Sequence, residues 1–324
     1  MKDYRVILYY IYVDIDDPDA CRDEQHLFCL ENDLLGRIIV APEGLNGTVS
    51  GLAADCEAYM GYLRNDPRFE KTQFKIEHYE GHAFKKLHVR VKNEIVNSSL
   101  PVNPNLRTGT HLEPSEFKQM LDDPEVVLVD MRSNYEHSVG RFKGAISFDM
   151  ENLRELPDHV AEIEHLRDKK IITYCTGGIK CEKASAYLLE RGFENVYQLH
   201  GGIIRYGLEV GGENFDGKCY VFDNRVAVEV NRVNPEVIAT CYVCATACDR
   251  MVNCANPECN LHVPICKECG EKLEGACSPA CQEHPAKRIY DGTGNYATKS
   301  NHYNPVQGFR SIKKQEIKQQ TIHE

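Results

Sequence analysis

The sequence lacks any apolar run that approaches the roughly 18 residues needed to cross a membrane. Its first apolar stretch, from Val6 to Val13, is interrupted at once by Asp14, Asp16 and Asp17, and no small-residue cleavage site follows. These absences argue against a membrane span and against a secretory signal in this segment. We therefore expect a cytoplasmic protein with no membrane partner.

Net positive charge is also missing. The 324 residues include 38 Lys and Arg against 49 Asp and Glu, a formal net charge of -11. A protein that binds nucleic acid through bulk electrostatics usually has the opposite sign, so any such contact must be local. One candidate is a basic, flexible tail over residues 286–324, for which solvated surface charge is the preferred interpretation. The other is the segment FKKLHVRVK, whose cations are Lys85, Lys86, Arg90 and Lys92.

Sequence motifs for redox cofactors are missing as well. No GxGxxG fingerprint is present, and we see neither a flavin nor a nicotinamide motif. No evident set of one carboxylate and two histidines indicates an iron site. The sequence therefore points to no bound redox cofactor.

Residues 1–97 have the pattern of an α+β sandwich. Apolar strand patterns occur at VILYYIYV, GRIIVA, GTVSG, FKIEHY and KLHVRVK, and one helix opens at Asp17 and Pro18 while another covers residues 53–63. The order βαββαβ predicts a ferredoxin-like, or acylphosphatase-like, domain. Residues 98–109 are rich in Pro and Asn, which predicts a linker.

Residues 110–212 have the pattern of an α/β domain. The short apolar runs VVLVD and IITYC are bounded by turns, and helical patterns surround them at EPSEFKQMLDD and EKASAYLLERG. Such runs are typical of buried parallel strands. The chain as a whole is therefore predicted to be a multidomain protein of α+β and α/β classes.

One loop of this second domain carries the clearest chemical signal. Cys175 ends a strand and a helix begins within six residues, so loop amides and the helix N-terminus converge on its sulfur and favour the thiolate. Gly177 and Gly178 allow the tight curl, and Lys180 adds positive charge. A buried structural cysteine would explain neither the glycines nor the lysine. Cys181 is either a resolving thiol or a plain helix residue, and we prefer the second interpretation.

Cysteine is abundant near the other end of the chain. Nine of the 15 cysteines fall between residues 241 and 281, mostly in pairs with the spacing of metal ligands in a reducing compartment. Segment 213–285 is therefore expected to contain a module with two structural zinc ions, which would supply much of its folding free energy. Cys248, His262 and His284 remain as spare ligands, so the partition stays open. We group the ligands as Cys241, Cys244, Cys266 and Cys269 at one site, and Cys254, Cys259, Cys277 and Cys281 at the other.

The middle domain resembles the rhodanese superfamily. The run VLVDMRSNYEHSVGRFKGAISF is similar to the upstream signature of that family, and it contributes Asp130, Arg132 and Arg141 as supporting residues. Four residues separate Cys175 from Lys180, as in six-residue rhodanese loops. A related phosphatase loop has five there and an arginine, so phosphatase chemistry is disfavoured.

Motifs along most of the chain resemble a narrower family, the rhodanese-domain tRNA uridine hydroxylases. They are EGLNGTVSG, YCTGGIKCEKAS, LHGGIIRYGLE, CYVFDNRVAVEVN and DRMVNCANPECN. The resemblance implies hydroxylation of the wobble uridine of tRNA at C5, with dioxygen as co-substrate, the anticodon region of tRNA as partner and Cys175 as active residue. Position 180 departs from the family pattern, because Lys180 stands where an arginine is expected and lacks its bidentate fork.

Two other functions stay open on the sequence. A rhodanese-type sulfurtransferase would carry a persulfide on Cys175, and a zinc-dependent scaffold would leave the rhodanese-like domain inert. The intact cysteine in its glycine-rich loop argues against the scaffold. For the hydroxylase, we expect tRNA to contact the FKKLHVRVK cations and single-stranded bases to stack on Phe84 or Tyr79.

Overall fold

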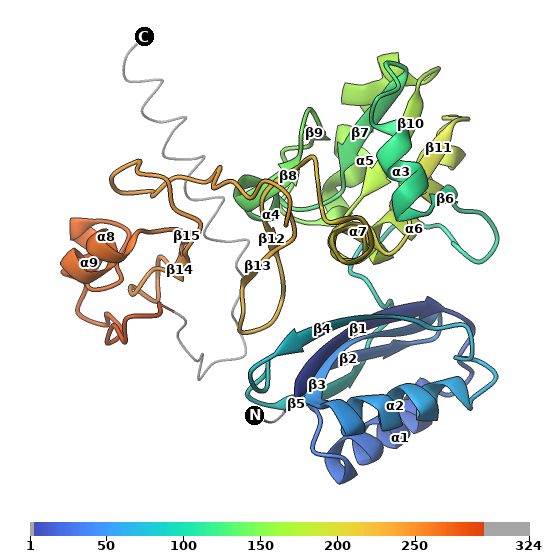
Figure 1. The fold of residues 1–324 in the computed structure, drawn as a ribbon, viewed down its shortest axis with the longest axis horizontal. Coiled ribbons are helices and arrows are strands. Elements are labelled where there is room, and N and C mark those ends of the chain that lie inside the picture. The colour runs from blue at the N-terminus through green and yellow to red at the C-terminus, as the bar shows by residue number, and fades with distance from the viewer. Residues whose placement is uncertain (1–2, 295–324) are drawn as a thin grey trace.

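The computed structural model describes residues 3–294 and shows three globular parts (Figure 1). The N-terminal part confirms the predicted ferredoxin-like sandwich. Its five strands are ordered β4-β1-β3-β2-β5, with β5 parallel to β2 at one edge. The elements are β1 (Tyr4–Tyr12), α1 (Pro18–Glu31), β2 (Leu35–Ala41), β3 (Gly44–Leu52), α2 (Ala53–Arg64), β4 (Gln73–Tyr79) and β5 (Leu87–Val91).

Alternation along the strands gives this sheet two different faces. Ile7 and Tyr9 of β1 belong to the core beneath α1 and α2, which cover one face (Figure 1). The neighbouring residues Leu8 and Tyr10 therefore point to the other face. That face has no helix of its own domain and turns toward the middle domain.

The middle part confirms the predicted rhodanese-like parallel sheet. Its strand order is β6-β11-β10-β7-β9, and each strand pair is parallel. The strands are β6 (Thr110–Leu112), β7 (Val126–Asp130), β9 (Ile146–Ser147), β10 (Lys170–Tyr174) and β11 (Val196–Leu199). The helices are α3 (Pro114–Met120), α4 (Asn134–Val139), α5 (Leu156–His159), α6 (Ile179–Glu190) and α7 (Gly202–Val210).

The chain after residue 212 first packs back onto the rhodanese domain. Strand β12 (Phe215–Tyr220) lies between β8 (Gly140–Phe142) and β13 (Ala227–Glu229) in a small antiparallel sheet. Phe215 and Val221 are buried in the same core as Phe142. Residues 213–230 therefore extend the rhodanese domain physically.

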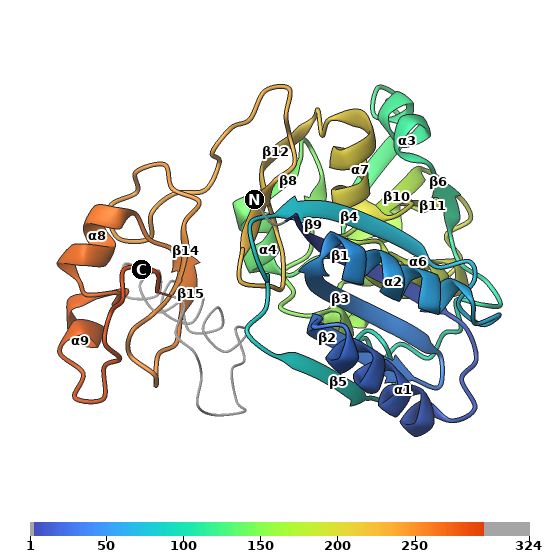
Figure 2. The same ribbon diagram turned by 60° about the horizontal axis from the view of Figure 1, so that its bottom comes forward.

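The cysteine-rich module lies to one side of the rhodanese domain in both views (Figures 1 and 2). It consists of β14 (Met251–Asn253), β15 (His262–Pro264), α8 (Lys267–Lys272) and α9 (Pro279–Gln282). Its core combines thiols with a few aliphatic side chains such as Val252 and Ile265. From the predicted tail, Arg288 donates to the Asn260 side chain of the module at 2.6 Å, whereas residues 295–324 lie outside the described part of the chain.

Ion pairs join the N-terminal domain to the start of α6. The buried Lys183 ammonium lies 2.8 Å from a Glu43 carboxylate oxygen and 2.9 Å from one of Glu94. These contacts attach the turn between β2 and β3 and the segment after β5 to α6. Among the helices within residues 3–294, none is long and apolar enough to span a bilayer.

Candidate active site

The loop from Cys175 to Gly178 connects β10 to α6 in a conformation that requires glycine. Gly178 has φ +99°, and a Cβ atom there would lie 2.8 Å from the Tyr10 hydroxyl oxygen. A Cβ atom on Gly202 would lie 2.5 Å from the carbonyl oxygen of Cys175. Because side chains are excluded at both positions, the backbone can wrap closely around the cysteine.

The surroundings of Cys175 favour its thiolate. The N–H of Gly178 donates to Cys175 Sγ at 3.2 Å. Burial alone raises the pKa of this thiol, but a hydrogen bond from the Cys181 thiol, the charge of Lys180 and loop N–H groups lower the pKa to about 7. Burial and the neighbouring Cys175 raise the pKa of Cys181 well above the usual thiol value. Cys181 is thus a neutral hydrogen-bond donor to Cys175.

The Lys180 side chain is held in place by an ion pair with a buried carboxylate. Its Nζ lies 2.7 Å from Glu136 Oε2, and the Glu136 side chain is fully buried. The other oxygen of Glu136 accepts a hydrogen bond from the Thr176 hydroxyl at 3.3 Å. Glu136 therefore fixes both the lysine and the loop residue that follows Cys175, a role that the sequence did not reveal.

Asp130 and Arg132 form a buried ion pair that supports the domain. Arg132 Nη2 lies 2.7 Å from Asp130 Oδ2 and also donates to the carbonyl oxygen of Gly140 at 2.6 Å. The hydroxyl of Tyr174, the residue before Cys175, donates to the same Asp130 oxygen at 2.9 Å. The pair thus positions the strand that presents the cysteine. Arg141 lies in β8, where its backbone pairs with Asp216 of β12.

The N-terminal domain covers the cysteine loop, which the sequence analysis missed. Lys75 of β4 is 4% exposed, and its Nζ donates to the carbonyl oxygen of Gly177 at 3.1 Å. The same ammonium lies 4.6 Å from the ring centroid of Tyr10. Burial lowers the pKa of Lys75 to about 8, while the nearby Cys175 opposes that shift. Cys175 is only 1% exposed under this cover.

A cavity of about 260 Å³ lies between the two domains beside the loop. Tyr10, Tyr12 and Lys75 line it from the N-terminal sheet, and Glu182 lines it from the first turns of α6. The Tyr10 hydroxyl donates to Glu182 at 2.9 Å, and the Tyr12 hydroxyl donates to the carbonyl oxygen of Ile179 at 3.4 Å. Two tyrosines of the cavity lining are thus hydrogen-bonded to the helix that follows the Cys175 loop.

These contacts predict the order in which the two thiols of the loop react. With limiting iodoacetamide, Cys175 should be alkylated before Cys181, at a rate that rises through pH 7 as the thiolate forms. Lys180→Met should move this midpoint upward, because it removes a cation and leaves the Glu136 carboxylate nearby. Peptide mapping across a pH series measures both effects, with Lys169→Met as a surface control. Modification of Cys181 ahead of Cys175 would reverse the assignment.

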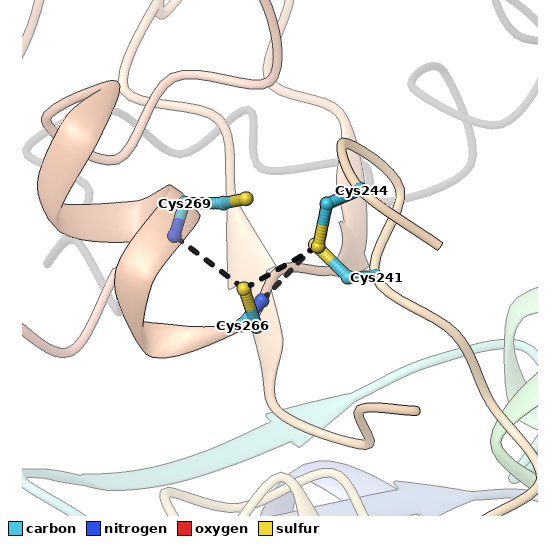
Figure 3. Close-up of side chains that lie close together, drawn as sticks. All are labelled: Cys241, Cys244, Cys266 and Cys269. Atoms are coloured by element: carbon cyan, nitrogen blue, oxygen red, sulfur yellow. Dashed lines mark hydrogen bonds between the residues drawn. The ribbon is translucent and has the colours of Figure 1, made fainter. Parts of the chain in front are cut away.

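The eight cysteines of the C-terminal module lie in the same two sets that the sequence analysis grouped. Within each set the sulfur atoms lie within 4.8 Å of one another. Figure 3 shows the first set, in which the sulfurs of Cys244 and Cys266 are 3.7 Å apart. In the second, Cys277 Sγ lies 3.7 Å from that of Cys259 and 3.8 Å from that of Cys281.

This geometry fits a tetrahedral zinc ion and not a disulfide. Zn–S bonds of about 2.3 Å place tetrahedral sulfurs about 3.8 Å apart, whereas a disulfide needs about 2.05 Å. Backbone N–H groups of Cys266 and Cys277 also donate to sulfurs of Cys241 and Cys254, at 3.3 and 3.4 Å. The three spare ligands stay outside both sets: Cys248 accepts from the Arg250 N–H, His262 pairs with Asn253 and His284 with Glu258.

The four predicted RNA-binding cations are exposed at one edge of the N-terminal sheet. Lys86, Arg90 and Lys92 are separated by even numbers of residues along β5 and its ends, so their side chains point to the same face of the sheet. Lys85 points to the other face. Leu87 and Val89 pack against the core beneath α1 and α2, so the three cations lie on the helix-free face. This is the face that covers the Cys175 loop.

The expected stacking of bases on Phe84 is wrong. Its side chain is 6% exposed and packs with Val6 and Ala83. A phenylalanine next to exposed lysines gives no local sign that it is buried by a neighbouring strand. Tyr79, the second candidate, is half-buried, and the Arg225 guanidinium lies 5.8 Å from its ring centroid.

Family comparisons match consecutive parts of the chain. Residues 4–95 match the UPF0176 acylphosphatase like domain, residues 113–207 the rhodanese-like domain, and residues 216–282 the rhodanase C-terminal domain. The third match begins at residue 216, so it includes strand β12, which packs onto the rhodanese domain in the structure.

Several curated relatives match the chain at length. A Cytophaga hutchinsonii protein named tRNA uridine(34) hydroxylase is 65% identical over 306 residues, which cover 94% of this chain and 98% of that protein. A protein of the same name from Listeria welshimeri is 51% identical and covers 77% of this chain and 80% of its own length. A third, from Bacillus velezensis, is 48% identical, with 77% and 79% covered.

Proposed function

Because this chain belongs to the tRNA uridine(34) hydroxylase family, we propose that it hydroxylates C5 of the wobble uridine with Cys175 as the reactive group and dioxygen as oxidant. The observation that carries the assignment of Cys175 is its position between β10 and α6, where the Gly178 N–H donates to its sulfur and the surroundings lower the pKa of the thiol. The similarity extends through the N-terminal domain, which covers the Cys175 loop and donates a hydrogen bond to it from Lys75. A sulfurtransferase acting through the rhodanese loop alone would not need this cover, so the alternative is not favoured.

The Cys175 loop suits covalent activation of a uracil ring. Addition of the Cys175 thiolate to C6 forms an S–C6 bond and moves the C5–C6 electron pair toward C5 and the O4 oxygen. C5 then becomes electron-rich toward an oxidant. Transfer of one oxygen atom of dioxygen to C5 consumes two electrons and two protons, for which we propose a thiol reductant, and releases the second oxygen as water. Loss of the C5 proton and the thiolate restores the ring.

We propose that the two cysteine sets hold structural zinc, in keeping with a cytoplasmic protein whose thiols stay reduced. Each ion would be coordinated by four thiolates and would close the module around its small core. The module contacts the rhodanese domain through aromatic rings. His262 of β15 lies 5.6 Å from the ring centroid of Tyr220, and Thr176 of the cysteine loop donates to the Tyr220 carbonyl oxygen at 3.4 Å. Folding of the module therefore affects the strand beside the active loop.

The basic edge of the N-terminal sheet is the proposed contact for the anticodon arm. Replacing Lys85, Lys86, Arg90 and Lys92 with glutamine should weaken tRNA binding and flatten its salt dependence, by a slope of roughly 0.7 to 0.9 for each lost phosphate contact. Titrations at several salt concentrations measure both quantities. A control with two charges removed changes Arg22 and Arg64 in α1 and α2, on the opposite face, and is compared with a variant in which only Lys86 and Arg90 are replaced. Equal affinity of the two variants would move the tRNA surface elsewhere.

The function is tested by nucleoside analysis of substrate tRNA. Purified protein incubated in air with a thiol reductant and unmodified tRNA should produce 5-hydroxyuridine at position 34. With ¹⁸O₂ in place of air, the product should gain the heavy isotope. Product that carries oxygen from water would retain the hydroxylase function and remove dioxygen from the proposal.

A further inference from the structure

The cavity beside the cysteine loop contains a cation without an anionic partner. Lys75 is buried, and among the described contacts its ammonium has one hydrogen bond, to the Gly177 carbonyl oxygen. No carboxylate lies within ion-pair distance of it in the described part of the chain. Burying an ammonium that uses one of three donors is costly. The arrangement is expected where a ligand supplies the missing acceptor.

The polar residues that line the cavity differ in exposure between its rim and its floor. Lys71, Gln73 and Asn105 line it with exposed side chains, whereas Lys75 and Glu182 are buried. The Glu182 carboxylate is already saturated by donors that include Tyr10 and His111, at 2.9 and 2.8 Å. A cation at the rim suits a phosphate. A floor that holds both a cation and an anion suits a neutral polar group.

The shape and lining of the cavity indicate the class of this ligand. Its volume of about 260 Å³ is enough for one nucleoside but not for a base-paired stem. The half-buried rings of Tyr10 and Tyr12 offer faces for a base, as in proteins that bind unstacked RNA nucleotides. The floor also adjoins the loop that carries the reactive sulfur, since the Lys75 ammonium donates to the Gly177 carbonyl oxygen and a Cβ atom on Gly178 would lie 2.8 Å from the Tyr10 hydroxyl oxygen.

We propose that this cavity receives the flipped-out wobble uridine, with Lys71 contacting its phosphate and the Lys75 ammonium binding a carbonyl oxygen of the uracil ring. The inference rests on the proposed function and names the pocket through which that function reaches its substrate. Lys75 thereby contacts the oxygen on which negative charge develops when a thiolate adds to the ring. It is a substrate-binding residue supplied by a domain other than the one that supplies the cysteine.

Photocrosslinking tests this pocket directly. An anticodon stem-loop RNA with 4-thiouridine at the wobble position is bound to the full-length wild-type protein, irradiated in the near ultraviolet and mapped by peptide mass spectrometry. We expect crosslinks within residues 4–12 and 73–79. Lys75→Met should reduce the yield about tenfold and Lys75→Arg should restore part of it. Lys169→Met, at an exposed lysine that pairs with Glu125 outside the cavity, should change neither the yield nor the crosslinked peptides.

The outcomes separate the pocket from the reaction. The exposed Phe222 ring, which lies 5.9 Å from Lys180 Nζ, marks another surface near the loop. Crosslinks confined to that surface or to the cysteine-rich module would overturn the pocket, even if unlabelled RNA is hydroxylated. Crosslinks in the cavity without any hydroxylation of unlabelled RNA would support the pocket and contradict the proposed reaction. If Lys75→Met fails to fold, as judged by circular dichroism, the wild-type crosslink map still decides the question.

Discussion

Cys175→Ala is expected to lower the rate of 5-hydroxyuridine formation by roughly 10³-fold or more, because it removes the reactive group while leaving the substrate surfaces in place. The structure supports a specific loss. The thiol is the acceptor of the Gly178 N–H, and its lowered pKa depends on Cys181 and Lys180, which the substitution leaves unchanged. Single-turnover conversion of substrate tRNA, followed by nucleoside mass spectrometry, measures the rate.

Two other cysteine variants serve as comparisons for the rate of Cys175→Ala. Cys29→Ala removes a fully buried thiol from the core of the N-terminal domain and should leave the rate within a few-fold of wild type. Cys181→Ala removes the hydrogen bond to Cys175, raises the pKa of Cys175 and should cause an intermediate loss. Full activity of Cys175→Ala would show that the sulfur takes no part in the reaction.

Loss of one zinc ion is the expected result of Cys254→Ser, and the cysteine-rich module should then lose its fold. Cys254 belongs to the second set of thiols, whose core otherwise contains few aliphatic side chains. On the proposed zinc assignment, metal binding supplies much of the folding free energy of the module. Elemental analysis should give about two zinc ions per chain for wild type and about one for the variant, with increased protease cleavage within residues 238–285.

The module provides a matched control within a few residues. Cys248 is buried in the same core but lies outside both sets, and its sulfur accepts a hydrogen bond from the Arg250 N–H at 3.4 Å. Cys248→Ser should keep both ions. Zinc lost equally from both variants would contradict the partition, and wild-type protein that contains no zinc would remove the metal assignment.

Features encoded within short segments could be predicted from the sequence. The Cys175 loop can be recognised in the sequence because the end of a strand, two glycines, a lysine and the start of a helix follow one another directly along the chain. The two cysteine sets were accessible for a related reason, since each knuckle keeps its ligands only a few residues apart. In such cases spacing along the chain determines spacing in the structure.

Contacts between distant segments could not be predicted in this way. Lys75 stands 102 residues before Gly177, and the alternation of β4 shows only that it faces away from the helices. Which surface packs there depends on how two domains dock. The pairing of Lys180 with Glu136, 44 residues earlier, and that of β12 with β8 were hidden for the same reason.

The most direct test of the central claim is the nucleoside composition of tRNA from a host strain that lacks wobble uridine hydroxylation, grown in air with and without this protein. We expect that wild-type protein restores 5-hydroxyuridine at position 34 and that Cys175→Ala at equal protein level does not. Absence of 5-hydroxyuridine with folded, zinc-loaded wild-type protein would contradict the claim, as would equal restoration by the two proteins.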